Sequence, residues 1–516
     1  MIKKRISLCG IFILLVNVLL AQNTILLNTA GAKDVINKNI YGHFAEHLGH
    51  CIYDGIYVGE KSKTIPNTNG IRNDIIEALK KLKVPVLRWP GGCFADTYQW
   101  KDGIGPKNKR PAIVNRWWGG VTEDNSFGTH DFLDMCKKIN CDPYLAANVG
   151  SGTVQNFIDW IQYVNFKPGS SPMAILREQN GKKQPWDVKI WGVGNEAWGC
   201  GGNMKPEHYA DIYKQYATFM TDWVNSDKLY RVASGANGAD YNWTEVMMRD
   251  IPKDMIEGVA LHHYSSVQWS NKGDAIDFSE EQYFKTLKSA LFMETLVTKH
   301  SAIMDKYDSA KKVALVVDEW GGWYEVEKGT NPGFLYQQNT IRDAMIAGVT
   351  LNIFNNHCDR VRMANLAQIV NVLQSVILTN KEKLILTPTY HVMEMYNVHQ
   401  DATLIPTQVK SNDYVFGNEK IPAVSVAASK DKNGVTHISL VNIDASKAQD
   451  ISIALNGAKY SAVTGRILTA KKLQDYNSFN DPLKIVPVNF TGAVLTADDI
   501  QVKLPPFSVV DRKSVV

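Results

Sequence analysis

The chain has 516 residues, of which 45% are hydrophobic and 10% aromatic, so it can bury a large core and form two or more domains. Its formal net charge is +4, and without the basic cluster Lys3, Lys4 and Arg5 it is +1. A nearly neutral chain without a basic run has no electrostatic footprint for nucleic acid, which excludes that class of partner.

The first residues are typical of a secretory signal peptide. Basic residues 3–5 precede the apolar run Ile6–Leu20, and Ala21 offers a small residue for cleavage before Gln22. The run is shorter than the about 20 residues of a membrane-spanning helix, and no later stretch approaches that length. We therefore expect residues 1–21 to be a signal peptide, the protein to be exported to the periplasm or beyond, and no membrane association. A retained anchor is the alternative.

Cysteine spacing gives no sign of a structural metal. Six cysteines follow the N-terminal segment, and they form neither a CxxC pair nor a His/Cys cluster with zinc spacing. Their pairing cannot be read from the sequence. The 13 Trp and 21 Tyr suit a sugar-binding protein, because aromatic faces pack on sugar rings, although most of them are expected in the core.

Between residues 38 and 400 the chain alternates short apolar runs with helical stretches. The expected strands are Ile40–Ala45, Val84–Trp89, Asp142–Asn148, Val188–Gly194, Arg231–Gly235, Gly258–His263, Val313–Asp318 and Leu351–Asn355. The expected helices are Ile71–Leu82, Thr129–Lys138, Val154–Val164, Pro206–Val224, Trp243–Arg249, Glu280–Tyr307 and Tyr336–Ala347. Eight such units predict an α/β fold, a closed (β/α)8 TIM barrel. An open doubly wound sheet is the alternative, weakened because no glycine-rich phosphate motif follows an early strand.

Residues 401–516 lack helical periodicity and predict a C-terminal antiparallel β-sandwich. Turn signals such as Asn433-Gly434 separate its strand-like segments. These segments are Tyr414–Phe416, Ala423–Ala428, Thr436–Ile443, Asp450–Leu455, Lys459–Leu468, Gly492–Thr496 and Asp499–Leu504. Within residues 22–37, the stretch Thr24–Asn28 is expected to add a strand to this sandwich.

Two glutamates follow expected barrel strands at the end where barrel enzymes carry their reactive groups. Glu196 comes just after the fourth strand and Glu319 directly after the seventh. Hydrolysis of a glycoside with retention needs one carboxylic acid and one carboxylate, about 5–5.5 Å apart, with the pKa of the acid raised by its surroundings. The pair predicts a retaining glycoside hydrolase, in which Asn195 suits a contact to the 2-hydroxyl of the sugar.

Several motifs resemble those of glycoside hydrolase family 51, the α-L-arabinofuranosidases. They run in the family's order through almost the whole barrel: Gly42 to Gly49, Leu87 to Gly92, Trp191 to Gly202, Leu261 to Tyr264, Asp318 to Tyr324, and Asn365 to Asn371. The resemblance implies a barrel plus a β-sandwich and a double displacement without metal or cofactor. It also implies release of terminal α-L-arabinofuranosyl residues from arabinose-containing plant polysaccharides or oligosaccharides, by a homo-oligomer that in this family is often a hexamer.

The resemblance also implies roles for individual residues. Glu196 matches the acid/base and Glu319 the nucleophile. The matching substrate-site residues are Glu46 for the furanose hydroxyls, Asn195 for the 2-hydroxyl, Arg88, His262 and Tyr264 beside the nucleophile, and Gln368 late in the barrel. The alternative for Arg88 and His262 is that each has only a structural role. Trp323 lies beside a catalytic strand end, where a tryptophan can pack on the sugar or on the core.

Cys93 departs from the pattern of those family members that carry Asn after the Pro-Gly-Gly turn. A thiol is a poorer hydrogen-bond partner than an amide. We expect Cys93 to be a free thiol that lines the pocket near the furanose. The alternative is that it is buried, or paired with another pocket-side cysteine such as Cys200.

Three other functions use the same kind of barrel. An endo-glucanase or xyloglucanase shares the two-glutamate chemistry but needs an open groove. A non-catalytic carbohydrate-binding protein would not require both Glu196 and Glu319. A metal-dependent aldolase or isomerase would lose activity with a chelator.

Overall fold

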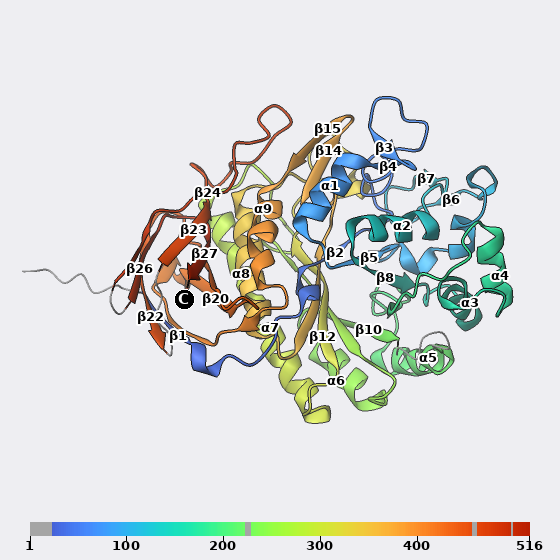
Figure 1. Cartoon of the computed structure of the whole chain (residues 1–516), viewed down its shortest axis with the longest axis horizontal. Helices are drawn as coiled ribbons and strands as arrows, with labels where there is room; N and C mark the ends of the chain where they lie inside the picture. The colour runs from blue at the N-terminus through green and yellow to red at the C-terminus, as the bar shows by residue number, and fades with distance from the viewer. Residues whose placement is uncertain (1–22, 222–228, 457–461, 497–498, 516) are drawn as a thin grey trace, which may run out of the picture.

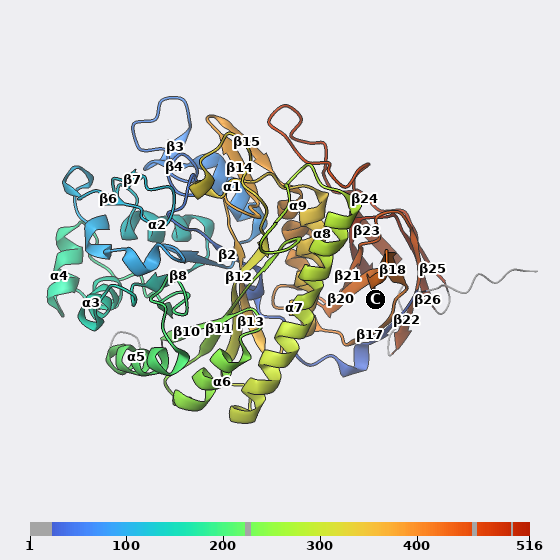
Figure 2. The same ribbon diagram turned by 180° about the vertical axis from the view of Figure 1, so that it is seen from behind.

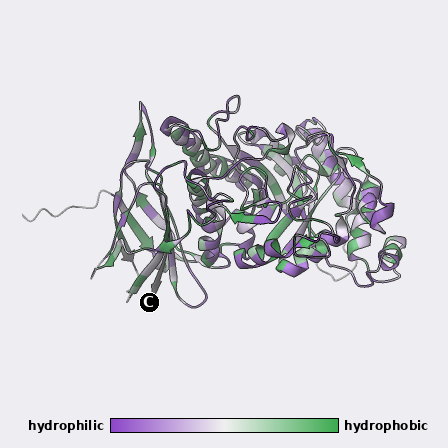
Figure 3. Cartoon of the chain, turned by 90° about the horizontal axis from the view of Figure 1, so that it is seen from above, coloured by the Kyte–Doolittle hydropathy of each residue, from purple (hydrophilic) through white to green (hydrophobic). Residues whose placement is uncertain are grey.

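The structure is a computed structural model that describes residues 23–221, 229–456, 462–496 and 499–515. Figures 1 and 3 show a sheet-rich part at one end of the long axis and a larger part, built of strands and helices, at the other. In the described ranges, no helix is both long enough and apolar enough to cross a membrane.

The larger part is a closed barrel of eight parallel strands, which confirms the predicted TIM barrel. Hydrogen bonds link the strands in chain order and then join the last to the first. The strands are β2 Gly42–Phe44, β5 Val86–Trp89, β8 Asp142–Ala147, β9 Ile190–Val193, β10 Tyr230–Asn237, β11 Gly258–Ser265, β12 Ala314–Gly322 and β13 Val361–Ala367. Most of their residues are buried, because helices cover the outside of the barrel while side chains fill its inside.

Helices follow these strands as expected, with small shifts at most of their ends. They are α1 Asn73–Leu82, α2 Thr129–Ile139, α3 Val154–Asn165, α5 Pro206–Phe219, α6 Tyr241–Asp250, α7 Glu280–Tyr307 and α8 Ile341–Asn356. The predicted Tyr336–Ala347 helix in fact begins five residues later and ends nine later, and the predicted Pro206–Val224 helix ends at Phe219, with Val224 outside the described residues. Two short helices that begin with proline, α4 Pro172–Gln179 and α9 Pro388–Met395, were not predicted. Seen from behind, α7 runs along the side of the barrel that adjoins the sandwich (Figure 2).

The predicted eighth strand, Leu351–Asn355, was wrong. These residues form the second half of α8, and the eighth strand is β13. The physical reason is that α8 lies between the barrel and the sandwich, where it contacts β12 on one side and β20 and β21 on the other. Residues 341–355 are all buried, so the helix has no polar face whose periodicity would reveal it.

The sheet-rich part is a two-sheet sandwich, as predicted. One sheet has the order β17-β1-β22-β26-β25 and the other β16-β20-β21-β27-β23-β24. Strand β1, Asn23–Asn28, pairs in parallel with β22, and the other pairs in both sheets are antiparallel.

The strands of the first sheet are β17 Thr407–Lys410, β22 Gln449–Asn456, β25 Ala493–Leu495 and β26 Asp499–Leu504, together with β1. Those of the second are β16 Thr403–Leu404, β20 Val424–Lys430, β21 Thr436–Asn442, β23 Ala462–Leu468, β24 Val488–Asn489 and β27 Ser508–Val515. The hairpin β18 Asp413–Phe416 and β19 Glu419–Pro422 stands apart and packs on α7. The domain boundaries at residues 38 and 400 stay a prediction.

Candidate active site

Two glutamates lie close together at the C-terminal end of the barrel strands. Glu319 belongs to β12, and Glu196 lies just beyond the end of β9. One carboxylate oxygen of each lies within 4.8 Å of the other and of a ring nitrogen of His262. Retaining glycosidases separate their two carboxyl groups by about 5–5.5 Å, and inverting ones by about 6.5–9.5 Å to admit a water. The spacing therefore suits direct attack on a sugar.

His262, on β11, links the two carboxylates. Its Nδ1 lies 2.9 Å from Glu196 Oε1 and 3.4 Å from Glu319 Oε2, while its Nε2 lies 2.9 Å from Asp318 Oδ1. Burial disfavours a charged ring, but the charges of Glu319 and Asp318 outweigh it and raise the pKa of His262 to about 10. The ring is therefore a buried cation that donates from both nitrogens.

Two of the carboxyl groups next to His262, those of Glu196 and Asp318, differ in acidity. Burial raises the pKa of Glu196, against the opposing hydrogen bond from His262, and the charge of Glu319 raises it further. Burial also acts on Asp318, but the charges of Arg88 and His262 outweigh it and lower the pKa of that carboxyl. Glu196 is thus the carboxyl in this cluster that is suited to hold a proton, which is the property that an acid catalyst needs.

Arg88, on β5, connects Glu319 to Asn195, the residue before Glu196. Its Nη1 donates to Glu319 Oε1 at 2.8 Å and its Nη2 to Asn195 Oδ1 at 2.5 Å. The Arg88 side chain is 2% exposed, and its Nε lies 3.8 Å from Asp318 Oδ2. A planar fork with several fixed donors can reach both residues at once, which a lysine cannot do.

Replacing Arg88 by methionine is expected to lower the free energy of unfolding by about 3–5 kcal/mol, because the buried carboxylates of Asp318 and Glu319 would keep one cation, His262, in place of two. Denaturant titration of both proteins measures the change. The matched control is Arg249→Met, which breaks an ion pair to Asp250 at the surface and should leave the midpoint unchanged. Equal, small effects of the two substitutions would contradict the structural part of this account.

Glu46 and Gln368 form the buried base of the site. Glu46 Oε1 accepts from the backbone N–H groups of Gly92 and Phe94 at 3.0 Å each, and Gln368 Nε2 donates to Glu46 Oε2 at 3.1 Å. Burial raises the pKa of Glu46 to about 7, against the hydrogen bond from Phe94. Trp118, which the sequence reasoning missed, donates to the same Oε1 at 2.9 Å.

A row of aromatic side chains leads from Glu319 to the surface. The hydroxyl of Tyr264 donates to Glu319 Oε2 at 2.8 Å. The ring of Trp323 meets Tyr264 edge-on, with centroids 4.9 Å apart, and Trp269 meets Trp323 at 5.3 Å. Trp269 was also missed. It is 61% exposed, and the Lys272 ammonium lies over its ring.

The prediction of a free, reactive thiol at Cys93 was wrong. Cys93 forms a disulfide with Cys200, which is the alternative that the sequence left open. The loops after β5 and β9 bring the two Cα atoms to 5.5 Å from each other, a normal distance for a disulfide. The two residues are 107 positions apart, so local sequence could not reveal the pair. Cys51, Cys136, Cys141 and Cys358 are free and buried.

One group of donors in this cluster lies close enough together to hold a metal ion. Glu196, His262 and Glu319 each offer an atom within 4.8 Å of the others. A histidine binds a metal through a neutral ring nitrogen, however, and the pKa of His262 keeps that ring protonated near neutral pH. The donor set therefore fits proton chemistry better than metal binding.

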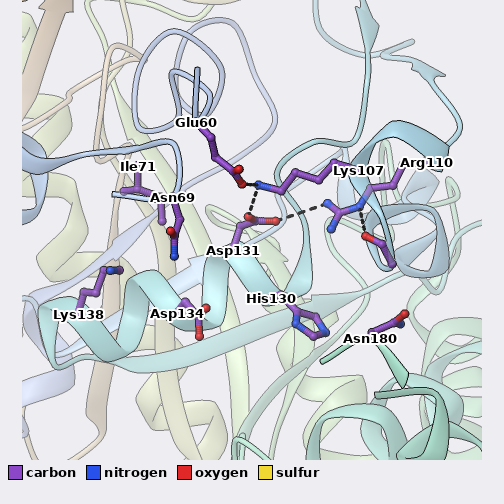
Figure 4. Close-up of a pocket in the computed structure, with 11 residues that line it drawn as sticks. Glu60, Asn69, Ile71, Lys107, Arg110, His130, Asp131, Asp134, Lys138 and Asn180 are labelled. Carbon is purple, nitrogen blue, oxygen red and sulfur yellow. Dashed lines mark hydrogen bonds and ion pairs between the residues drawn. The ribbon is translucent and has the colours of Figure 1, made fainter. Parts of the chain in front are cut away.

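A separate pocket of about 170 Å³ shares no residue with this cluster (Figure 4). Lys107 donates to Glu60 and to Asp131 at 2.9 Å each, and Arg110 contacts Asp131 at 3.5 Å. The charges at its centre therefore already pair with each other, and we assign this pocket no part in the chemistry.

Comparison with known proteins places the chain among arabinofuranosidases. Residues 78–281 match a family model described as the alpha-L-arabinofuranosidase 1 domain, and residues 318–508 match the alpha-L-arabinofuranosidase C-terminal domain. An intracellular exo-alpha-L-arabinofuranosidase of Bacteroides ovatus is 51% identical over 94% of each chain.

Solved structures agree with this result. The GH51 arabinofuranosidase of Xanthomonas axonopodis pv. citri is 46% identical, with a TM-score of 0.94 over 96% of this chain and 100% of that one. The alpha-L-arabinofuranosidase of Thermotoga maritima, solved as an arabinose complex, is 30% identical, with a TM-score of 0.84 over the same shares.

The prediction of an exported protein was wrong on this comparison, because the Bacteroides ovatus relative is named an intracellular enzyme. The pattern behind the prediction lies in residues 1–21, outside the described residues. A basic and apolar N-terminal pattern is purely compositional, and the prediction made from it did not draw on the fold of the rest of the chain.

Proposed function

Because the chain belongs to glycoside hydrolase family 51, it is an arabinofuranosidase that releases arabinofuranosyl residues from arabinose-containing glycans, and we propose that Glu196 and Glu319 carry out this reaction with retention. The observation that carries the proposal is the approach of one oxygen from each carboxylate to within 4.8 Å. This leaves room for a sugar carbon between them but not for an additional water in line.

In the proposed first step, Glu319 attacks the anomeric carbon while Glu196 gives its proton to the departing glycosidic oxygen. The carbon–oxygen bond to the leaving group breaks as the bond to Glu319 forms. In the second step Glu196, now a carboxylate, takes a proton from water, and that water displaces Glu319 with a second inversion. The raised pKa of Glu196 supports its role as the acid, and the contacts of Glu319 with Arg88 and Tyr264 fix the position of both of its oxygens, which suits a nucleophile.

The remaining predicted residues suit a pocket for a terminal sugar. Glu46 and Gln368 present polar atoms at the buried base, where furanose hydroxyls would bind, and Asn195 is held by Arg88 for the 2-hydroxyl. The exposed ring of Trp269 beside Trp323 suits the next unit of a plant polysaccharide or oligosaccharide. An endo-acting glucanase would need an open groove in place of this base. Assembly into a hexamer stays a prediction.

The stereochemistry of the product tests the proposal. The α-anomer of arabinose should appear first in a proton NMR time course with an aryl α-L-arabinofuranoside, and the β-anomer should follow only through mutarotation. A chelator should leave the rate unchanged. If the β-anomer forms first, the enzyme inverts, and the assigned double displacement is wrong.

A further inference from the structure

One short segment after β5 anchors the backbone on both sides of Glu196. On the N-terminal side, the Asp96 carboxylate accepts from the backbone N–H of Asn195 at 2.9 Å. On the C-terminal side, Cys93 is bonded to Cys200, four residues beyond the glutamate. Glu196 itself has a φ of 38°, a left-handed conformation that a residue with a side chain keeps only where its surroundings hold it.

The disulfide also faces one particular oxygen of Glu196. Oε1 lies against the protonated ring of His262, which donates a hydrogen bond to it. Oε2 faces the sulfurs, at 3.4 Å from Cys200 Sγ and 3.9 Å from Cys93 Sγ. Since Oε1 already accepts from a cation, the proton of the carboxylic acid belongs on Oε2.

A disulfide suits an oxygen that must carry a proton. Its sulfurs have no hydrogen to donate, so they give a carboxylate nothing, whereas they can accept weakly from an O–H. They also occupy the space in which water would hydrate Oε2, and poor hydration favours the neutral acid. Both effects raise the pKa of Glu196, which is also the direction in which burial shifts it.

We propose that the Cys93–Cys200 disulfide is a positioning element for the acid/base: it holds the loop that carries Glu196 and shields one side of Oε2 from water, which favours the protonated acid. The inference rests on the proposed role of Glu196 and adds residues that touch the reaction only through it. It assigns Cys93, which stands where some family members carry Asn, a part in acid catalysis.

Other charges around Glu196 stay in place when the disulfide is opened. His262 and Tyr264 face it from β11, Glu319 from β12 and Arg88 from β5. None of these groups belongs to the two cross-linked loops. A change in acidity on opening the disulfide would therefore report the hydration and position of Oε2, and not the loss of a charged partner.

The test uses the double variant Cys93→Ser/Cys200→Ser, with Cys358→Ser, a free buried cysteine, as the matched control. With an arabino-oligosaccharide, kcat/KM of the double variant should fall about tenfold or more, and with 4-nitrophenyl arabinofuranoside about threefold or less, because an activated leaving group needs little protonation. The alkaline limb of its pH profile should move to lower pH by about half a unit or more, since hydroxyls and water would stabilise the carboxylate. The control should match the wild type in both respects.

Reduction of the folded wild type gives a second measurement that does not depend on a variant's folding. Dithiothreitol supplies two electrons and two protons, the S–S bond breaks, two thiols form, and the reagent closes to its cyclic disulfide. Cys93 and Cys200 are both partly exposed, so the reagent can reach them. Reduction should move the pH limb and the leaving-group dependence toward those of the double variant, reoxidation should restore them, and the double variant should not respond.

Unchanged pH limbs and equal losses on both substrates, in the double variant and in the reduced wild type, would overturn the positioning role. This result is distinguishable from failure of the proposed function, because Glu196→Gln would still show a leaving-group dependence if Glu196 is the acid. If Glu196→Gln shows none, the proposed function fails first.

Discussion

Replacing Glu319 by alanine is expected to lower kcat by a factor on the order of 10⁴ to 10⁶, as loss of a nucleophile does in other covalent mechanisms. The side chain is 7% exposed, and its two oxygens are fixed by Arg88 and Tyr264, so no neighbouring carboxylate can take its place without breaking these contacts. The shortened side chain leaves room for a small anion beside Arg88. Added azide should therefore restore turnover and give an arabinofuranosyl azide of inverted configuration.

The controls for this prediction separate chemistry from folding. Glu319→Gln keeps the shape of the side chain and should be nearly as inactive, and its circular dichroism spectrum shows whether the fold is retained. Glu281→Ala removes an exposed glutamate of α7 and should not change kcat. Wild-type-like activity of Glu319→Ala, or rescue by azide with retained configuration, would remove Glu319 from the mechanism.

Replacing Glu196 by alanine is expected to produce the second largest effect, and its size should depend on the leaving group. Loss of a general acid costs about 10²- to 10⁴-fold where protonation of the leaving oxygen is needed, as in an oligosaccharide, and much less for a nitrophenyl glycoside. Formation of the intermediate from the nitrophenyl substrate should stay fast, whereas its hydrolysis should become slow because the base is missing.

The pH dependence gives an independent check on Glu196. The reaction needs its protonated form, and burial raises the pKa of this carboxyl, so the acid persists to higher pH than for an exposed glutamate. Activity should fall as pH rises through that pKa, and this alkaline limb should be absent in Glu196→Ala. Equal losses on both substrates, with the limb retained, would show that another group is the acid.

Most of the barrel could be predicted because parallel strands buried on both faces leave short, continuous apolar runs. Seven of the eight strands were predicted in this way. The eighth was misplaced because α8 is buried on all sides, and its apolar second half has the composition of a strand. The true strand β13 contains two polar residues, Arg362 and Asn365, among its apolar ones, which hid it from the search for apolar runs.

The glutamate pair could be predicted from position alone, because the ends of parallel barrel strands meet at one face. Contacts that depend on long loops could not be predicted from the sequence. Trp118 reaches Glu46 from a loop 72 residues further along the chain, and the disulfide partner of Cys93 is 107 residues away. Their approach is set by the packed barrel and leaves no local pattern. The structure brings Arg88, Asn195 and His262 into contact with each other or with the pair, as the motif order suggested, while Glu46 holds the backbone of the turn after β5.

The most direct measurement of the central claim is a search for the covalent intermediate on the Glu196→Ala enzyme. After brief exposure to 4-nitrophenyl α-L-arabinofuranoside and acid quenching, the protein should gain the mass of one anhydro-arabinose. Peptide mapping should place that mass on Glu319. An adduct on another carboxylate, or an enzyme that turns over this substrate with inversion and without any adduct, would contradict the account.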